Sequence, residues 1–108
     1  MSYEIIPTPF FTRDAKPLVK KYPSLKNELI RLETILADNP LMGESLGKDC
    51  YKIRLSIASK GKGKSGGARV ITFVKIIDKQ VFLLAIYDKN EMENIDDAVL
   101  KERIKNTR

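Results

Sequence analysis

The spacing of apolar residues in the first third of the chain predicts a short strand followed by two helices. Residues 3–8 read as a strand that ends at two prolines. A first helix is expected from an N-cap at Thr12 to about Tyr22. A second helix, capped by Ser24, has one apolar stripe and stops before the Asn-Pro pair at 39–40; the stripe consists of Leu25, Leu29, Leu32 and Leu36.

The remainder of the chain predicts three strands and a last helix. Residues 50–57 alternate between apolar and polar side chains, as a half-buried strand does. Residues 69–77 and 81–87 predict a hairpin, and a helix with weak apolar contacts at Ile95, Val99 and Ile104 is expected from Asn94 or Asp96 toward Asn106. The order β-α-α-β-β-β-α predicts a single α+β domain over residues 1–108. It would have a small, mainly antiparallel four-stranded sheet, a helical hairpin on one face and a short C-terminal helix.

Positive charge is concentrated in one part of this chain, whose formal net charge is +6. Between Lys48 and Lys75 there are eight basic residues and one acid, Asp49, so this segment carries +7 and the rest carries −1. Such a segment attracts polyanions, although a solvated basic hairpin that aids solubility has the same composition.

Several kinds of chemistry are excluded by the residues that the chain lacks. It contains no histidine and one cysteine, Cys50, which excludes an internal disulfide, a histidine general base and a cysteine-based zinc site. We therefore predict no metal and no cofactor. The longest apolar run, residues 81–87, is too short to span a membrane, and the start of the chain lacks a signal-peptide pattern. These features favour a cytoplasmic location.

One face of the predicted sheet collects cations. If the apolar residues of strand 50–57 face the helices, Lys52 and Arg54 face away from them, and Arg69 joins them from the next strand. One of the two possible alternations of side chains along the last strand adds Tyr87 and Lys89 to this face. Cations suit RNA phosphates and an aromatic ring suits a base, so we predict an open RNA-binding face. Its catalytic candidates are Lys52, Arg54, Arg69, Tyr87 and Lys89, and its RNA-binding candidates are Lys48, Lys60, Lys62, Lys64, Phe73 and Lys75.

Three segments resemble the RelE/ParE superfamily of bacterial toxins, and in particular its RelE- and HigB-like branches. They are residues 49–55, residues 65–71, and residues 84–91 with 93–95 behind them. The resemblance implies the toxin of a type II toxin–antitoxin pair, with a cognate antitoxin as partner. It also implies a metal-independent endoribonuclease (an mRNA interferase) that enters the ribosomal A site, cuts the mRNA and so inhibits translation. The RNA's own 2′-OH is then the nucleophile, which leaves a 2′,3′-cyclic phosphate and a 5′-OH.

The resemblance also assigns positions within the site. Lys52 and Arg54 match the two lysines of the RelE strand, Arg69 matches the arginine that opens the next strand, and Lys89 corresponds roughly to a further arginine. The catalytic tyrosine of RelE-type members falls at Ile95, so the general base stays open among Tyr87, Lys52 and Lys89. Two alternatives are a ParE-like inhibitor of DNA gyrase without enzymatic activity and an RNA-binding domain that does not cleave. We expect the antitoxin to contact the basic segment or the last helix.

Overall fold

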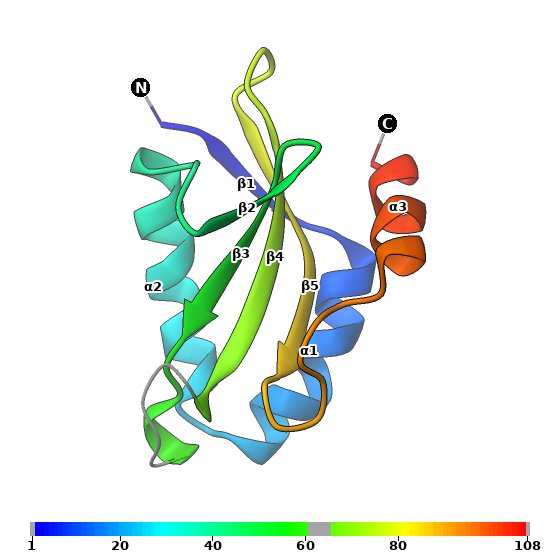
Figure 1. Ribbon diagram of the computed structural model, residues 1–108. Coiled ribbons are helices and arrows are strands. Elements are labelled where there is room, and N and C mark those ends of the chain that lie inside the picture. The colour runs from blue at the N-terminus through cyan, green and yellow to red at the C-terminus, as the bar shows by residue number, and fades with distance from the viewer. Residues whose placement is uncertain (1, 61–65, 108) are drawn as a thin grey trace.

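The computed structural model describes residues 2–60 and 66–107, and their secondary structure follows the predicted order with one added strand. The elements are β1 (Glu4–Pro7), α1 (Pro9–Lys21), α2 (Leu25–Asp38), β2 (Glu44–Gly47), β3 (Cys50–Leu55), the 3₁₀ turn η1 (Ala58–Lys60), β4 (Ala68–Lys75), β5 (Gln80–Asp88) and α3 (Asp97–Lys105), as Figure 1 shows. None of the helices in this described part of the chain is long and apolar enough to cross a membrane.

The strands form one five-stranded sheet in the order β1-β5-β4-β3-β2. β1 runs parallel to β5, and the other neighbouring pairs are antiparallel. The α+β class is therefore confirmed, but the prediction of four strands missed β2. All four residues of β2 are exposed, and its sequence Glu-Ser-Leu-Gly has no apolar alternation that would mark a strand. Only the pairing of its backbone with β3 identifies it as a strand.

The helical hairpin covers one face of the sheet, as predicted. The leucine stripe of α2 packs against strand residues such as Ile53, Val70 and Leu83. The helix α1 begins earlier than expected, because Thr8 rather than Thr12 is its N-cap: the Thr8 hydroxyl accepts a hydrogen bond from the Phe11 backbone N–H over 3.2 Å. Pro9 follows the cap, a position at which a missing N–H is tolerated.

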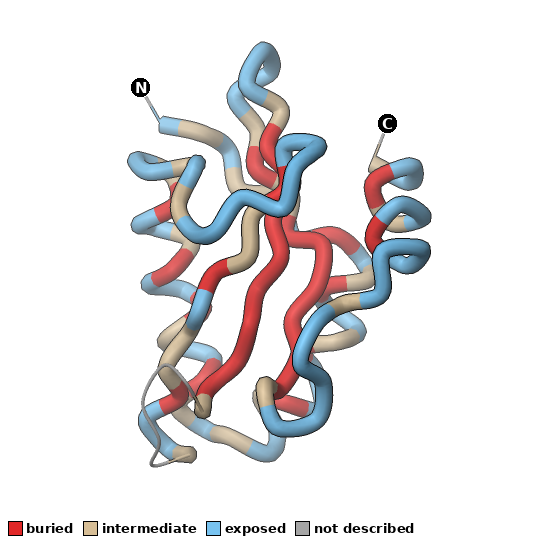
Figure 2. Tube along the Cα trace, in the orientation of Figure 1, coloured by how far each residue is buried: buried red, intermediate tan, exposed pale blue. Residues whose placement is uncertain are grey.

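The opposite face of the sheet is not open, which corrects the sequence-based expectation. Leu100 and Ile104 of α3 pack on Ile71 and Phe73 of β4 and form a second core with Cys50, Leu84 and Tyr87. Figure 2 shows β4 and β5 buried along most of their length. The helix is held by Leu100 and Ile104, whereas Val99, predicted as an apolar contact, is exposed.

A β-bulge in β5 changes which side chains share a face. Ile71 pairs with Ala85 and Thr72 pairs with Leu83, so Leu84 has no partner of its own. Leu83 faces the helical hairpin, while Ala85 and Tyr87 face α3. One unbroken alternation of side chains between the two faces from residue 81 to residue 89 is therefore wrong. The extra residue reverses the face to which each following side chain points.

Candidate functional site

Three of the predicted site residues lie in a row across the three central strands, near the end of the sheet where β4 begins and β5 ends. Arg54 on β3 pairs with Arg69 on β4, and Arg69 pairs with Tyr87 on β5. Directly opposed residues of antiparallel strands point to the same face with their Cβ atoms about 5 Å apart. The register therefore brings two guanidinium groups and a phenol together on the face that carries α3.

Arg69 is the most buried cation of this row. Only 3% of its surface is exposed, and its Nη1 donates a hydrogen bond to the Ala68 carbonyl over 3.1 Å. Its position at the start of β4 depends on Gly67, where an added Cβ would collide with the Leu55 carbonyl. Arg54 in contrast is exposed, because the paired part of β2 reaches along β3 only as far as Lys52.

Lys52 connects the sheet to the segment that precedes α3. Its Nζ donates a hydrogen bond to Asn94 Oδ1 over 3.1 Å and lies 3.5 Å from Glu44 Oε1. Neither Glu44 nor Asn94 was predicted as a site residue. Glu44 was missed because β2 has no apolar alternation, and no spacing rule connects Asn94 to a residue 42 positions earlier.

Tyr87 has a buried hydroxyl that makes no well-aligned hydrogen bond with any group in the described part of the chain. Burial raises the pKa of the phenol, while the charge of Arg69 and the nearby Ile95 backbone act in the opposite direction. The net direction is upward, so Tyr87 keeps its proton at neutral pH.

Two cavities adjoin Tyr87, and Ile95 lines both of them. The first, of about 180 Å³, also contains Lys52. The second, of about 400 Å³, lies beside Arg103 of α3, whose Nη1 contacts Asp14 Oδ2 over 2.6 Å and the Leu84 carbonyl over 2.9 Å. The phenol of Tyr87 therefore lies beside position 95, where the resemblance expects the catalytic tyrosine.

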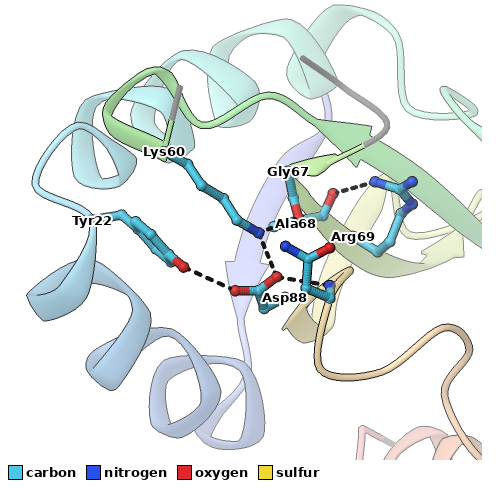
Figure 3. A network of polar contacts seen from close by, with 7 residues as sticks. Tyr22, Lys60, Gly67, Ala68, Arg69 and Asp88 are labelled. Atoms are coloured by element: carbon cyan, nitrogen blue, oxygen red, sulfur yellow. Dashed lines mark hydrogen bonds and ion pairs between the residues drawn. The ribbon is translucent and has the colours of Figure 1, made fainter. Parts of the chain in front are cut away.

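Lys60 does not lie on the face expected for it. Its Nζ is 2.5 Å from Asp88 Oδ1 with both side chains almost fully buried, and it is 3.5 Å from the Gly67 carbonyl (Figure 3). The same carboxylate accepts hydrogen bonds from the Tyr22 hydroxyl over 3.1 Å and from the Asn90 backbone N–H over 2.9 Å. Lys60 thus connects η1 to the start of β4, where Arg69 lies, and to the end of β5, where Tyr87 lies.

The other candidates are spread around the sheet. Phe73 is only 7% exposed and packs near Phe82 at a ring-centroid distance of 6.2 Å, so it is a core residue rather than an open aromatic platform. Lys75 Nζ donates a hydrogen bond to the Thr107 carbonyl over 3.2 Å. Lys89 is half-buried, and its backbone N–H donates to the Gly67 carbonyl over 3.1 Å. Lys48 is exposed at the β2–β3 turn, and Lys62 and Lys64 lie outside the described residues.

We expect Asp88→Asn to lower the free energy of unfolding by about 3–5 kcal/mol, because it leaves the Lys60 ammonium buried without a counter-charge. Burial alone would raise the pKa of Asp88, but the hydrogen bonds from Lys60, Asn90 and Tyr22 outweigh it and lower that pKa. The stabilisation is therefore complete above the pKa of an unfolded Asp, about 3.9, and is lost as the pH falls through the lower folded value.

Urea unfolding of both proteins between pH 7 and pH 2 measures this contribution. Asp97→Asn is the matched control, because it removes an exposed partner of Lys101 and should cost less than about 1 kcal/mol. Equal losses in the two variants at pH 7, or a gap that does not shrink in acid, would contradict the assignment.

The fold and the site together define a small α+β protein with two arginines and a tyrosine in register on the sheet face that also carries the C-terminal helix. A family model described as the RelE toxin of the RelE/RelB toxin-antitoxin system matches residues 10–107. This chain therefore belongs to the RelE toxin family, and the family's description implies an antitoxin as its partner.

Solved structures share the fold at low sequence identity. A mutant of the E. coli toxin RelE in the free state is 20% identical, with a TM-score of 0.63 and 98% of each chain covered. The isolated E. coli RelE toxin is also 20% identical, with a TM-score of 0.58, and the match covers 99% of this chain and 100% of that one. At this identity the likeness establishes the architecture alone.

Proposed function

We propose that this toxin is a metal-independent endoribonuclease that cuts mRNA in the ribosomal A site and so inhibits translation in the cytoplasm. The observation that carries the proposal is the row of Arg54, Arg69 and Tyr87 across three strands, with Lys52 beside it. Membership in the RelE toxin family supports the same activity.

The reaction needs no nucleophile from the protein. The 2′-oxygen of the RNA attacks the adjacent phosphorus, the bond from phosphorus to the 5′-oxygen breaks, and a 2′,3′-cyclic phosphate and a 5′-OH result. Extra negative charge develops on the phosphoryl oxygens in the transition state. A guanidinium group donates several N–H groups in a fixed plane, which suits Arg54 and Arg69 to bind those oxygens.

Two protons move in this step. The raised pKa of Tyr87 keeps its proton in place at neutral pH, which suits it to donate that proton to the leaving 5′-oxygen. The 2′-OH proton goes to a base, and we assign this role to Lys52, because it lines the same cavity as Tyr87. Lys89, the other candidate base, lines neither cavity that contains Tyr87.

The end groups of the cut RNA test the proposed function. Purified protein is mixed with ribosome–mRNA complexes, and the fragments are analysed for their termini. We expect a 2′,3′-cyclic phosphate and a 5′-OH. Intact messages together with inhibited DNA gyrase would support the ParE-like alternative, and bound but uncut RNA would support a binding domain.

Tyr87→Phe should slow cleavage of ribosome-bound mRNA by about 10²–10⁴-fold, the usual effect of losing a general acid or base. The same change should not lower the melting temperature, because the hydroxyl it removes is buried without a well-aligned hydrogen bond. Single-turnover cleavage and thermal unfolding of the same preparation separate the two effects. Tyr51→Phe, on β3, is the matched control, and full activity of Tyr87→Phe would remove Tyr87 from the mechanism.

A further inference from the structure

We infer that Lys48, Lys101 and Lys105 form a second phosphate-binding site for the RNA strand, between the tip of the β2–β3 hairpin and α3. The predicted catalytic residues do not include Lys101 or Lys105, and the family's description assigns no role to any of the three lysines. The inference rests on the proposed function and deepens it, because it states where the RNA continues beyond the reacting phosphate.

The site is a cavity of about 430 Å³ with a basic rim. The three lysines and Asp49 supply its charged side chains, so the lining carries a net charge of +2. Phe73 and Ile104, which are almost fully buried, form the apolar part of the lining. All three lysines are exposed, which leaves their ammonium groups accessible to a phosphate.

The local structure explains how the lysines meet. Lys101 and Lys105 are one helical turn apart on α3 and therefore share a face. Lys48 and Asp49 both have positive φ, 54° and 63°, as a tight two-residue turn of type I′ requires. The Asp49 carbonyl accepts a hydrogen bond from the Val74 backbone N–H over 2.9 Å, which fixes the turn to the end of β4.

The charges already present favour an incoming anion. Lys101 is paired with Asp97 over 3.1 Å, but both side chains are largely exposed. An exposed pair of this kind on a helix contributes little to stability, so a phosphate can compete for the lysine. Asp49 opposes anion binding, and the three cations outnumber it.

The lysine cavity lies next to the cavity that holds Lys52 and Tyr87 of the candidate active site. The cavity with Lys52 and Tyr87 is bounded by Leu46 of the hairpin and by Asp97 and Leu100 of α3. The lysine cavity is bounded by the next residues along the same two elements. Figure 1 shows the tip of the hairpin and α3 at the same end of the molecule. Phe73 pairs with Cys50 and Ile71 pairs with Lys52, so the two cavities are about 7 Å apart along β3.

The ligand that fits is the phosphodiester backbone of single-stranded RNA. Lysine ammonium groups act as point charges that hold phosphate without reading bases. The neighbouring cavity holds Lys52 and Tyr87, the residues proposed to move the protons of the reaction, so neighbouring phosphates of the same strand reach the lysines. An acidic peptide carries comparable charge but has no reason to extend into the catalytic row, and it becomes an outcome of the test.

The salt dependence of RNA binding tests this site. The variant Lys48→Gln/Lys101→Gln/Lys105→Gln is compared with Lys16→Gln/Lys20→Gln/Lys26→Gln, which removes the same charge from exposed positions on α1 and α2 across the sheet. The probe is a single-stranded RNA with 2′-O-methyl groups, which cannot be cut. Each lost phosphate contact should lower the log–log slope by about 0.7, so the first variant should lose about 2 and the control should keep the wild-type slope.

Two results would overturn the inference. One is equal slopes for the two variants, and the other is a loss of affinity for poly-glutamate in the first variant with RNA binding unchanged. The proposed function is judged separately, by wild-type cleavage of ribosome-bound mRNA, so a cleaving protein with unaltered slopes rejects only the lysine site. Thermal unfolding of both variants confirms that they are folded.

Discussion

The Arg69→Ala protein should cleave ribosome-bound mRNA about 10²–10³ times more slowly than the wild type and should no longer arrest growth. The guanidinium of Arg69 is buried and in register with Arg54 and Tyr87, and in the proposed function it binds charge that appears only in the transition state. By analogy with the loss of one oxyanion donor, this costs about 3–4 kcal/mol. Single-turnover cleavage measures the rate, and induction in a strain without antitoxin measures growth.

Because Arg69 is also part of the core, its variants need structural controls. Arg69→Lys keeps the charge but loses the planar guanidinium group with its several N–H donors, so it should recover only part of the rate. Arg31→Ala removes an exposed arginine from α2, on the other side of the sheet, and should behave as the wild type. A folded Arg69→Ala protein that cuts at the wild-type rate would show that the row of Arg54, Arg69 and Tyr87 is not the catalytic site.

Naked mRNA should be cut negligibly at physiological salt, although the same message is cut on the ribosome. In the proposed function this face binds RNA through phosphate contacts, which position a strand but carry no sequence information. Holding the 2′-oxygen in line with the leaving oxygen is worth about 7–11 kcal/mol, and we expect the ribosome to impose that geometry. Incubation of free and ribosome-bound message with equal toxin, followed by gel analysis, compares the two rates. Equal rates would indicate a ribonuclease that needs no ribosome.

The sequence was most informative where side chains alternate or recur regularly. The leucines of α2 and the alternation in β3 predicted both elements and the face each one buries, because burial of an apolar stripe dominates the local choice. The same alternation placed Lys52 and Arg54 on the face opposite Ile53. These predictions depend on local periodicity, which requires no knowledge of distant contacts.

The errors arose where a distant contact decides the structure. β2 is held only by its pairing with β3, and the bulge at Leu84 reverses the phase of β5 without a glycine to mark it. The buried state of Lys60 depends on Asp88, 28 positions later, which no charge count can reveal. Phe73 is buried because Leu100 and Ile104 of α3 pack against it. Two apolar residues one turn apart in a short polar helix are a weak sign that the helix packs on the sheet.

The position of the cut relative to the ribosome is the most direct test of the proposed function. Ribosomes are stalled at one defined codon of a message, wild-type toxin is added, and the new 5′ ends are mapped by primer extension. We predict cuts inside the codon in the A site, and a shift of the cut by three nucleotides when the ribosome is advanced by one codon. Cuts that stay at fixed positions of the message, or a message that remains intact, would contradict the proposal.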